Sequence, residues 1–206
     1  DSVVEGINVH AFRKATGSIL AREDKDLHAD IVIGVPDSSL SAAIGYAEEA
    51  GIPFETGLIK NRYIGSTFIR PTEQQRMQGM RVRLNAISSV VKDKRVYLVD
   101  DSVVKGFTSR RICQLLKEAG AKEVHLRIAS PMLKYPCLYG ADSTAQKDLA
   151  AFNYTVDEME QLFQVDSLRF LSVEDFKKCV PETSCLACCT GECPEDLQDY
   201  KDEVKE

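Results

Sequence analysis

The stretch RVYLVDDSVVKGFTS, residues 95–109, decides the fold. It begins with a short apolar run typical of a strand buried on both faces, and the run ends at two adjacent carboxylates, Asp100 and Asp101. Gly106 and two hydroxyl residues then lead into an amphipathic helical pattern. A strand followed by a loop and a helix N-terminus directs backbone N–H groups and the helix dipole at an anion. The sequence therefore predicts an anion-binding loop over 102–109.

The side chains of this loop suit a phosphorylated ribose. The hydroxyls of Ser102, Thr108 and Ser109 are hydrogen-bond donors, and Gly106 lets the backbone approach a phosphate closely. The paired carboxylates can accept hydrogen bonds from vicinal sugar hydroxyls or hold a hard divalent cation. A solvated turn after a strand is the alternative that these residues alone leave open.

A second strand, loop and helix precede this one. The run ADIVIGV at 29–35 predicts a buried strand, and PDSS at 36–39 a loop that opens the next helix. Strands that alternate with helices indicate an α/β fold, a parallel sheet flanked by helices. Its ligands would lie where the loops at the carboxyl ends of the strands converge. The other expected elements are a helix over 8–22, strands over 54–59 and 124–129, a helical pattern over 143–163 and a last helix capped by Ser172.

Composition narrows the class of protein. The chain has 206 residues and a net charge of −6, which argues against a nucleic-acid-binding surface. With no apolar run that could span a bilayer and no signal peptide, we predict a cytoplasmic protein without a membrane segment. Five of seven cysteines fall within 179–193, which favours metal or cluster ligation over disulfides. We predict a domain over 1–180 and a cysteine-rich acidic tail over 181–206.

Two stretches resemble a known family. DDSVVKGFTS at 100–109 resembles the phosphoribosyl diphosphate signature of type I phosphoribosyltransferases, and most closely the DDSIVRGTT form of the glutamine phosphoribosyldiphosphate amidotransferases. KNRYIGSTFIRP at 60–71 is similar to that family's KNRYVGRTFIQP, which begins a loop that closes over the substrate. The resemblance covers almost the whole chain and implies a type I phosphoribosyltransferase fold with a C-terminal helical and cysteine-rich extension.

The resemblance also implies roles for individual residues. The loop at 36–39 would bind the diphosphate and 102–109 the 5′-phosphate, while the aspartate pair would hold the ribose hydroxyls. The substrate-binding set is then Asp37, Ser39, Asp100, Asp101, Ser102, Lys105, Gly106, Thr108 and Ser109; the lid set is Lys60, Arg62 and Tyr63; and the Mg²⁺ ligands are Ser38, Asp100 and Asp101.

Three residues depart from the family pattern. Ser66 and Lys105 stand where the family has arginine, and Phe107 stands where it has threonine. These departures bear on the catalytic rate and leave the binding prediction unchanged. They motivate an alternative hypothesis, in which the chain is a regulatory module that binds nucleotides or phosphoribosyl diphosphate and has lost turnover.

The cysteines indicate a second cofactor. CLACCTG and YPCLYG resemble motifs of the iron–sulfur class of this family, which implies Cys137, Cys185 and Cys188 as ligands of a [4Fe–4S] cluster. The fourth family ligand lies just upstream of the first residue of this chain. Cys179, Cys189 or Cys193 could replace it, and the spacing selects none of them.

The function implied is that of the phosphoribosyltransferase half of an amidophosphoribosyltransferase, an enzyme of purine biosynthesis. Ammonia would attack C1 of phosphoribosyl diphosphate, giving phosphoribosylamine and diphosphate. The glutaminase half is expected to be absent, because the sequence starts where that half would end, so no glutamine-dependent activity is expected from this chain alone. Purine nucleotides are expected as inhibitors, and a homo-oligomer as the assembly.

Overall fold

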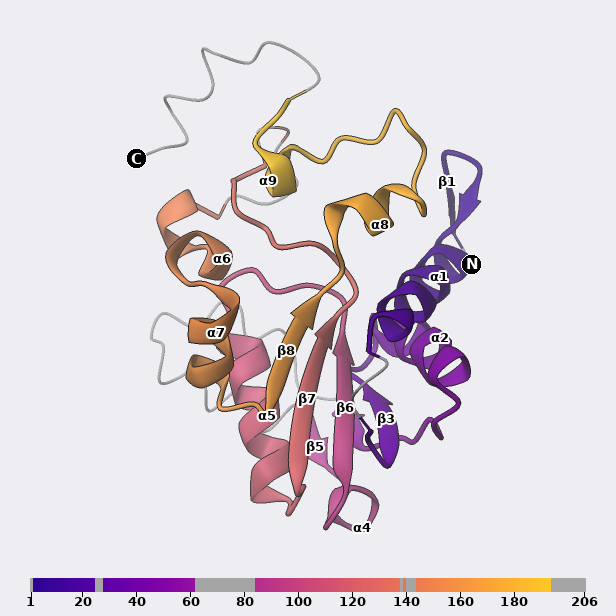
Figure 1. Ribbon diagram of the computed structural model, residues 1–206, viewed down its shortest axis with the longest axis vertical. Helices are drawn as coiled ribbons and strands as arrows, with labels where there is room; N and C mark the ends of the chain where they lie inside the picture. The colour runs from indigo at the N-terminus through magenta and orange to yellow at the C-terminus, as the bar shows by residue number, and fades with distance from the viewer. Residues whose placement is uncertain (1, 25–27, 62–83, 138, 140–143, 194–206) are drawn as a thin grey trace.

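A four-stranded, fully parallel sheet forms the centre of the protein in a computed structural model, which describes residues 2–24, 28–61, 84–137, 139 and 144–193 (Figure 1). The order across the sheet is β3-β6-β7-β8. The strands are β3 (Ile31–Gly34), β6 (Arg95–Asp100), β7 (Glu123–Ile128) and β8 (Ser167–Phe170). Because all four run the same way, their carboxyl ends meet at one edge. The predicted α/β class with a parallel sheet is confirmed.

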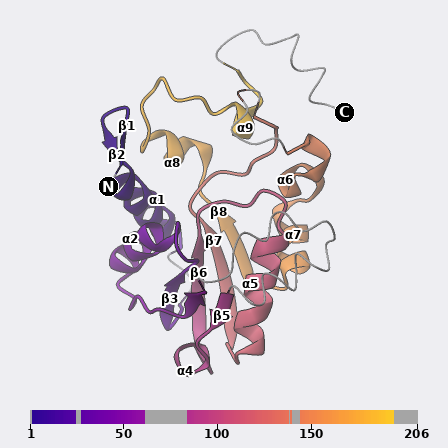
Figure 2. The same ribbon diagram turned by 180° about the vertical axis from the view of Figure 1, so that it is seen from behind.

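Helices cover both faces of this sheet. Helices α1 (Val9–Arg22) and α2 (Leu40–Ala50) lie on one side, and α5 (Phe107–Glu118) and α7 (Val156–Phe163) on the other (Figures 1 and 2). Side chains alternate along β6 as expected for a strand between two layers. Val96 and Leu98 join the core beneath α5, while Tyr97 and Val99 join the core beneath α2.

Short elements complete the described chain. Strands β1 (Val3–Val4) and β2 (Ile7–Asn8) form an antiparallel pair, as do β4 (Leu58–Lys60) and β5 (Leu84–Ala86). The remaining elements are α4 (Ser88–Val91), the 3₁₀ turn η2 (Gln146–Asp148), α6 (Ala150–Asn153), α8 (Val173–Lys177) and α9 (Ala187–Thr190). Among the described residues, no helix is both long and apolar enough to cross a bilayer.

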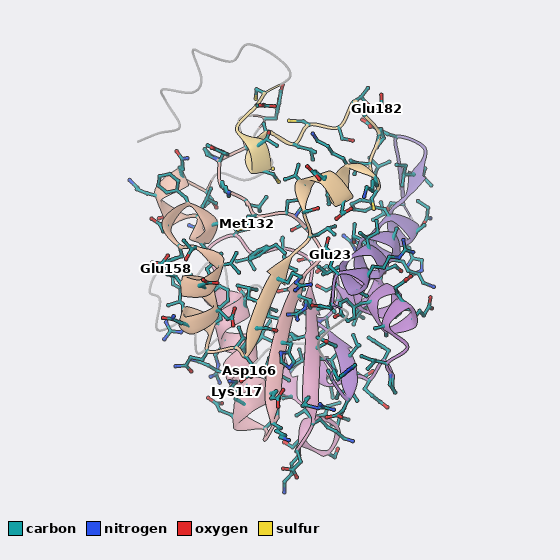
Figure 3. All side chains as sticks on the ribbon, viewed as in Figure 1. Glu23, Lys117, Met132, Glu158, Asp166 and Glu182 are labelled. Atoms are coloured by element: carbon teal, nitrogen blue, oxygen red, sulfur yellow. The ribbon has the colours of Figure 1, made fainter. Side chains whose placement is uncertain are left out.

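Several local expectations are refined by the structure. The strand expected over 54–59 contributes only a bridge from Phe54 to Val32, and its end pairs with β5 outside the main sheet. The helical pattern over 143–163 is interrupted at Tyr154. Thr155 and Glu158 then form a capping box that starts α7, and Glu158 is labelled in Figure 3. The Ser172 cap is confirmed, since its hydroxyl accepts a hydrogen bond from the backbone N–H of Asp175.

A buried ion pair ties the end of α1 to the middle of the sheet. Arg127 on β7 is fully buried, and its Nε and Nη2 both donate to the carboxylate of Asp24, the latter over 3.0 Å. The hydroxyl of Tyr46 on α2 donates to the same carboxylate over 2.6 Å. The guanidinium also lies 5.2 Å from the ring centroid of Tyr97. Both charges are thus paired and hydrogen-bonded, which is the condition for burying them.

Candidate functional site

Two loops meet at the carboxyl edge of the sheet. The first, residues 35–39, joins β3 to α2, and the second, residues 101–106, joins β6 to α5. Their strands are neighbours in the sheet, and the backbone N–H of Val35 donates to the carbonyl of Val99 over 3.0 Å. The structure therefore brings together the two loops that the sequence predicted would converge.

Asp100 lies at the junction of these loops. The residue is only 5% exposed, and its Oδ1 accepts hydrogen bonds from the Ser39 hydroxyl and from the backbone N–H of Asp101, each over 2.9 Å. Burial, with the charge of Asp101 as the second cause, raises the pKa of Asp100 to about 7. Burial makes the ionised form of this carboxyl group unfavourable, and a nearby cation would stabilise that ionised form.

The residues of the first loop take distinct positions. Ser39 is fully buried, Ser38 is half-buried and Asp37 is exposed. Lys60, at the end of β4, donates to the Asp37 carboxylate over 3.0 Å and so lies beside the loop. The peptide bond between Pro36 and Asp37 is cis. The other predicted lid residues, Arg62 and Tyr63, and the departure at Ser66 lie outside the described residues.

The second loop keeps its polar groups near the start of α5. The Ser102 hydroxyl donates to Asp101 over 3.4 Å, Thr108 is exposed and Ser109 is buried in the first turn of the helix. Phe107 is 53% exposed. Lys105 is exposed and donates to Asp148 over 2.9 Å.

Residues between β7 and β8 contact this second loop and hold it in place. Gly106 has a φ of +79°, and a Cβ atom placed on it would lie 2.9 Å from two ring atoms of Phe163 on α7. The backbone N–H of Ala150 donates to the carbonyl of Val104 over 2.8 Å. Together with the pair between Lys105 and Asp148, these contacts fix the loop from outside the motif. Nothing in the sequence indicated that Asp148, Ala150 and Phe163 contact this loop, because they lie far from it along the chain and belong to no motif.

Of the predicted cluster ligands, Cys185 and Cys188 lie at α9, apart from the two loops. Lys134 and Tyr135 both donate backbone hydrogen bonds to the carbonyl of Cys188, over 2.9 and 3.0 Å, which holds the segment leading to Cys137 against α9. The thiols of Cys188 and Cys189 are 3.8 Å apart, and this hydrogen bond lowers the pKa of Cys188 to about 6. Within the described ranges, no three His, Cys, Asp or Glu side chains are grouped so as to hold a metal ion.

A cavity of about 290 Å³ lies between β8, α8 and α9. Its lining includes Met132, labelled in Figure 3, together with Leu168 and Cys189. None of the lining residues belongs to the two loops, so this cavity is separate from the site at their junction.

Comparison with known proteins places this chain in a family. Residues 8–154 match the phosphoribosyl transferase domain, and the chain belongs to the phosphoribosyltransferase family. Its relatives within that family are amidophosphoribosyltransferases. The chain is 51% identical over 211 residues to the enzyme of Bacillus subtilis, covering 99% of this chain and 44% of that one. It is 47% identical over 199 residues to the enzyme of Archaeoglobus fulgidus, covering 94% and 43%.

A solved structure agrees with this placement. The glutamine phosphoribosylpyrophosphate amidotransferase of B. subtilis, complexed with ADP and GMP, superposes with a TM-score of 0.85 at 52% identity, covering 97% of this chain and 45% of that one. The type I phosphoribosyltransferase fold implied by the sequence resemblance is thereby confirmed. The chain spans less than half the length of these relatives.

Proposed function

We propose that this chain carries out the phosphoribosyl transfer step of an amidophosphoribosyltransferase, in which ammonia displaces diphosphate from C1 of phosphoribosyl diphosphate. The observation that carries the proposal is the junction of the two loops, where the carboxylate of Asp100 is held between them. The loop after β3 carries hydroxyl groups. The loop after β6 begins at two carboxylates and leads to the N-terminus of α5. This arrangement of two loops on either side of a carboxylate pair suits a ligand with a ribose between two anionic groups.

Each part of the ligand has a proposed partner. The 5′-phosphate binds the loop formed by Ser102, Lys105, Gly106, Thr108 and Ser109, whose backbone N–H groups lie at the start of α5. The ribose hydroxyls donate to Asp100 and Asp101. The diphosphate binds the loop at 36–39, beside Lys60. Arg62 and Tyr63 are proposed lid residues from the sequence alone.

The donors at this junction fit Mg²⁺. The ion prefers oxygen ligands, keeps several waters and is commonly held by one or two carboxylates together with substrate phosphates. Asp100, Asp101 and the hydroxyl of Ser38 supply such oxygens. With phosphate oxygens and waters as the other ligands, Mg²⁺ needs no further acidic or histidine side chain here. When bound, the ion would neutralise charge on the departing diphosphate.

The residues of the chain then act by position and charge. The two loops fix the ribose and both anionic groups, which orients C1 toward the incoming ammonia and away from bulk water. The loop N–H groups and Lys60 stabilise negative charge on the phosphates as the bond to diphosphate breaks. No covalent intermediate with the protein is needed, because ammonia itself forms the new bond to C1.

Other features of the relatives are proposed for this chain more briefly. The B. subtilis structure contains ADP and GMP, and we propose that purine nucleotides bind here as inhibitors. The [4Fe–4S] ligands Cys137, Cys185 and Cys188 stay a prediction from the sequence resemblance, since the three thiols are not grouped in the described part of the chain. Iron and sulfide analysis of the purified protein tests it. A homo-oligomer and a cytoplasmic location stay predictions from the sequence.

Calorimetry with phosphoribosyl diphosphate and Mg²⁺ tests the site. We expect the double variant Asp100→Asn, Asp101→Asn to lose binding, because both ribose partners lose their charge. Asp93→Asn is the matched control, since Asp93 is exposed just before β6, at the opposite end of the same strand. Unchanged affinity in the double variant would refute the assignment.

An activity assay separates the enzyme from the regulatory alternative. The protein is mixed with phosphoribosyl diphosphate, Mg²⁺ and free ammonia, and the release of diphosphate is measured. Release that depends on ammonia supports the transferase. Binding without release would support the regulatory module instead.

A further inference from the structure

Ser39 has an unusual role for a residue at a helix N-terminus. A serine directly before a helix ordinarily accepts a hydrogen bond from a backbone N–H of the first turn. Ser39 precedes α2 but makes no such bond, and its backbone is in the right-handed helical region, with φ −89° and ψ −4°. Its hydroxyl instead donates to Asp100, on a different strand and 61 residues away in the sequence.

The contacts of Asp100 show what this bond does to the carboxylate. Oδ1 accepts both the Ser39 hydroxyl and the Asp101 backbone N–H, while no described residue donates to Oδ2. Among the described residues, the Arg111 Nε is the sole enclosed side-chain nitrogen or oxygen without a partner. The Asp100 Oδ2 is therefore not enclosed, and the small exposed part of this residue includes it. One oxygen is anchored and the other is presented at the site.

We propose that Ser39 is a positioning residue that orients the Asp100 carboxylate toward the ribose, and that it does not itself bind the diphosphate. The proposal rests on the proposed function of the site. It differs from the role that the sequence resemblance implied, which placed Ser39 among the direct substrate ligands. Two observations separate the roles: Ser39 has 0% exposure, and its one hydroxyl proton is already donated to Asp100.

This role also couples the two loops. The hydroxyl comes from the last residue of the first loop, and the carboxylate from the last residue of β6, directly before the second loop. This hydrogen bond joins the two loops directly, and it is stronger when Asp100 is ionised, because a charged acceptor strengthens a hydrogen bond. The spacing between the diphosphate loop and the ribose-binding pair is then set before any ligand arrives, which is preorganisation of the site.

Three probes distinguish a positioning role from direct binding in the variant Ser39→Ala. The affinities are measured by calorimetry or by competition. Phosphoribosyl diphosphate and ribose 5-phosphate are measured with Mg²⁺ present. Inorganic diphosphate is measured without it, so that Asp100 does not contribute through the ion. Loss of one charge-assisted hydrogen bond is expected to weaken the two ribose-containing ligands about 10- to 100-fold. Without Mg²⁺, inorganic diphosphate should bind within about twofold of the unaltered protein, because its remaining proposed partners, residues 36–38 and Lys60, are untouched.

The controls make each outcome decisive. Ser18→Ala removes a hydroxyl that donates to the carbonyl of Gly45 between α1 and α2, away from the site, and should change none of the three affinities. Ser39→Cys keeps the side-chain volume with a weaker donor and should give intermediate values, which covers the case in which Ser39→Ala folds poorly. A loss of diphosphate affinity as large as that of ribose 5-phosphate would overturn the proposal, as would unchanged affinities throughout. If the unaltered protein binds no phosphoribosyl diphosphate, the proposed function itself fails.

Discussion

Replacing Gly106 with alanine should destabilise the protein and weaken phosphate binding together. Its φ of +79° is left-handed, which costs an alanine about 1–2 kcal/mol. The added Cβ would also lie 2.9 Å from the Cε1 and Cζ atoms of Phe163, and such overpacking costs about 1–3 kcal/mol. The expected loss of unfolding free energy is therefore roughly 2–5 kcal/mol.

Gly51→Ala isolates the first of these two costs. Gly51 also has a positive φ, +66°, but a Cβ there would meet no atom within 4 Å. Urea unfolding followed by circular dichroism should show a loss of about 1–2 kcal/mol for this variant, from the left-handed backbone alone. Affinity for phosphoribosyl diphosphate should fall in Gly106→Ala and stay unchanged in Gly51→Ala. Equal losses of stability in both variants would refute the proposed steric contact with Phe163.

Three further predictions follow from buried and exposed charges. The folded protein favours the neutral form of the Asp100 carboxyl. The resulting contribution to the free energy of unfolding is fully present below about pH 4 and is lost as pH rises through the folded pKa of about 7. The free energy of unfolding measured in urea should therefore depend less on pH in Asp100→Asn than in the unaltered protein. Asp24→Ala should lose roughly 3–5 kcal/mol in urea unfolding because it leaves Arg127 buried and unpaired. Glu49→Ala breaks an exposed pair and should lose far less; equal losses would contradict this. Lys105→Ala should weaken ribose 5-phosphate binding in calorimetry with little change in stability, since the ion pair of Lys105 is exposed; unaltered binding would remove Lys105 from the phosphate site.

The centre of the fold could be predicted because its signals are local. The apolar runs that became β3 and β6 are continuous, as is typical of buried parallel strands, and each is bounded by polar or glycine residues. In β7 the apolar residues instead alternate with His125 and Arg127. The strand β8, with the sequence SLRF, gave no such run because it lies at the edge of the sheet, and only Leu168 among its residues is buried. Its place became visible only from its pairing with β7.

The candidate site shows the same division. The positions of the two loops and of the aspartate pair could be predicted from the motifs, since each loop directly follows one of two neighbouring strands, β3 and β6. The contact between Ser39 and Asp100 did not follow, because nothing in VPDSS states which of two adjacent serines faces inward. The contact of Gly106 with Phe163 was equally hidden, because it joins residues that only tertiary packing brings together.

The buried pair of Asp24 and Arg127 has a consequence for how this sequence can diverge. Asp24 changed alone leaves the charge of Arg127 uncompensated inside the protein, whereas Arg127 changed alone leaves Asp24 paired with Arg169 over 3.1 Å. Descendants of this chain should therefore lose Asp24 only together with Arg127 or after it. Positions 24 and 127, 103 residues apart in the chain, are expected to change in that order.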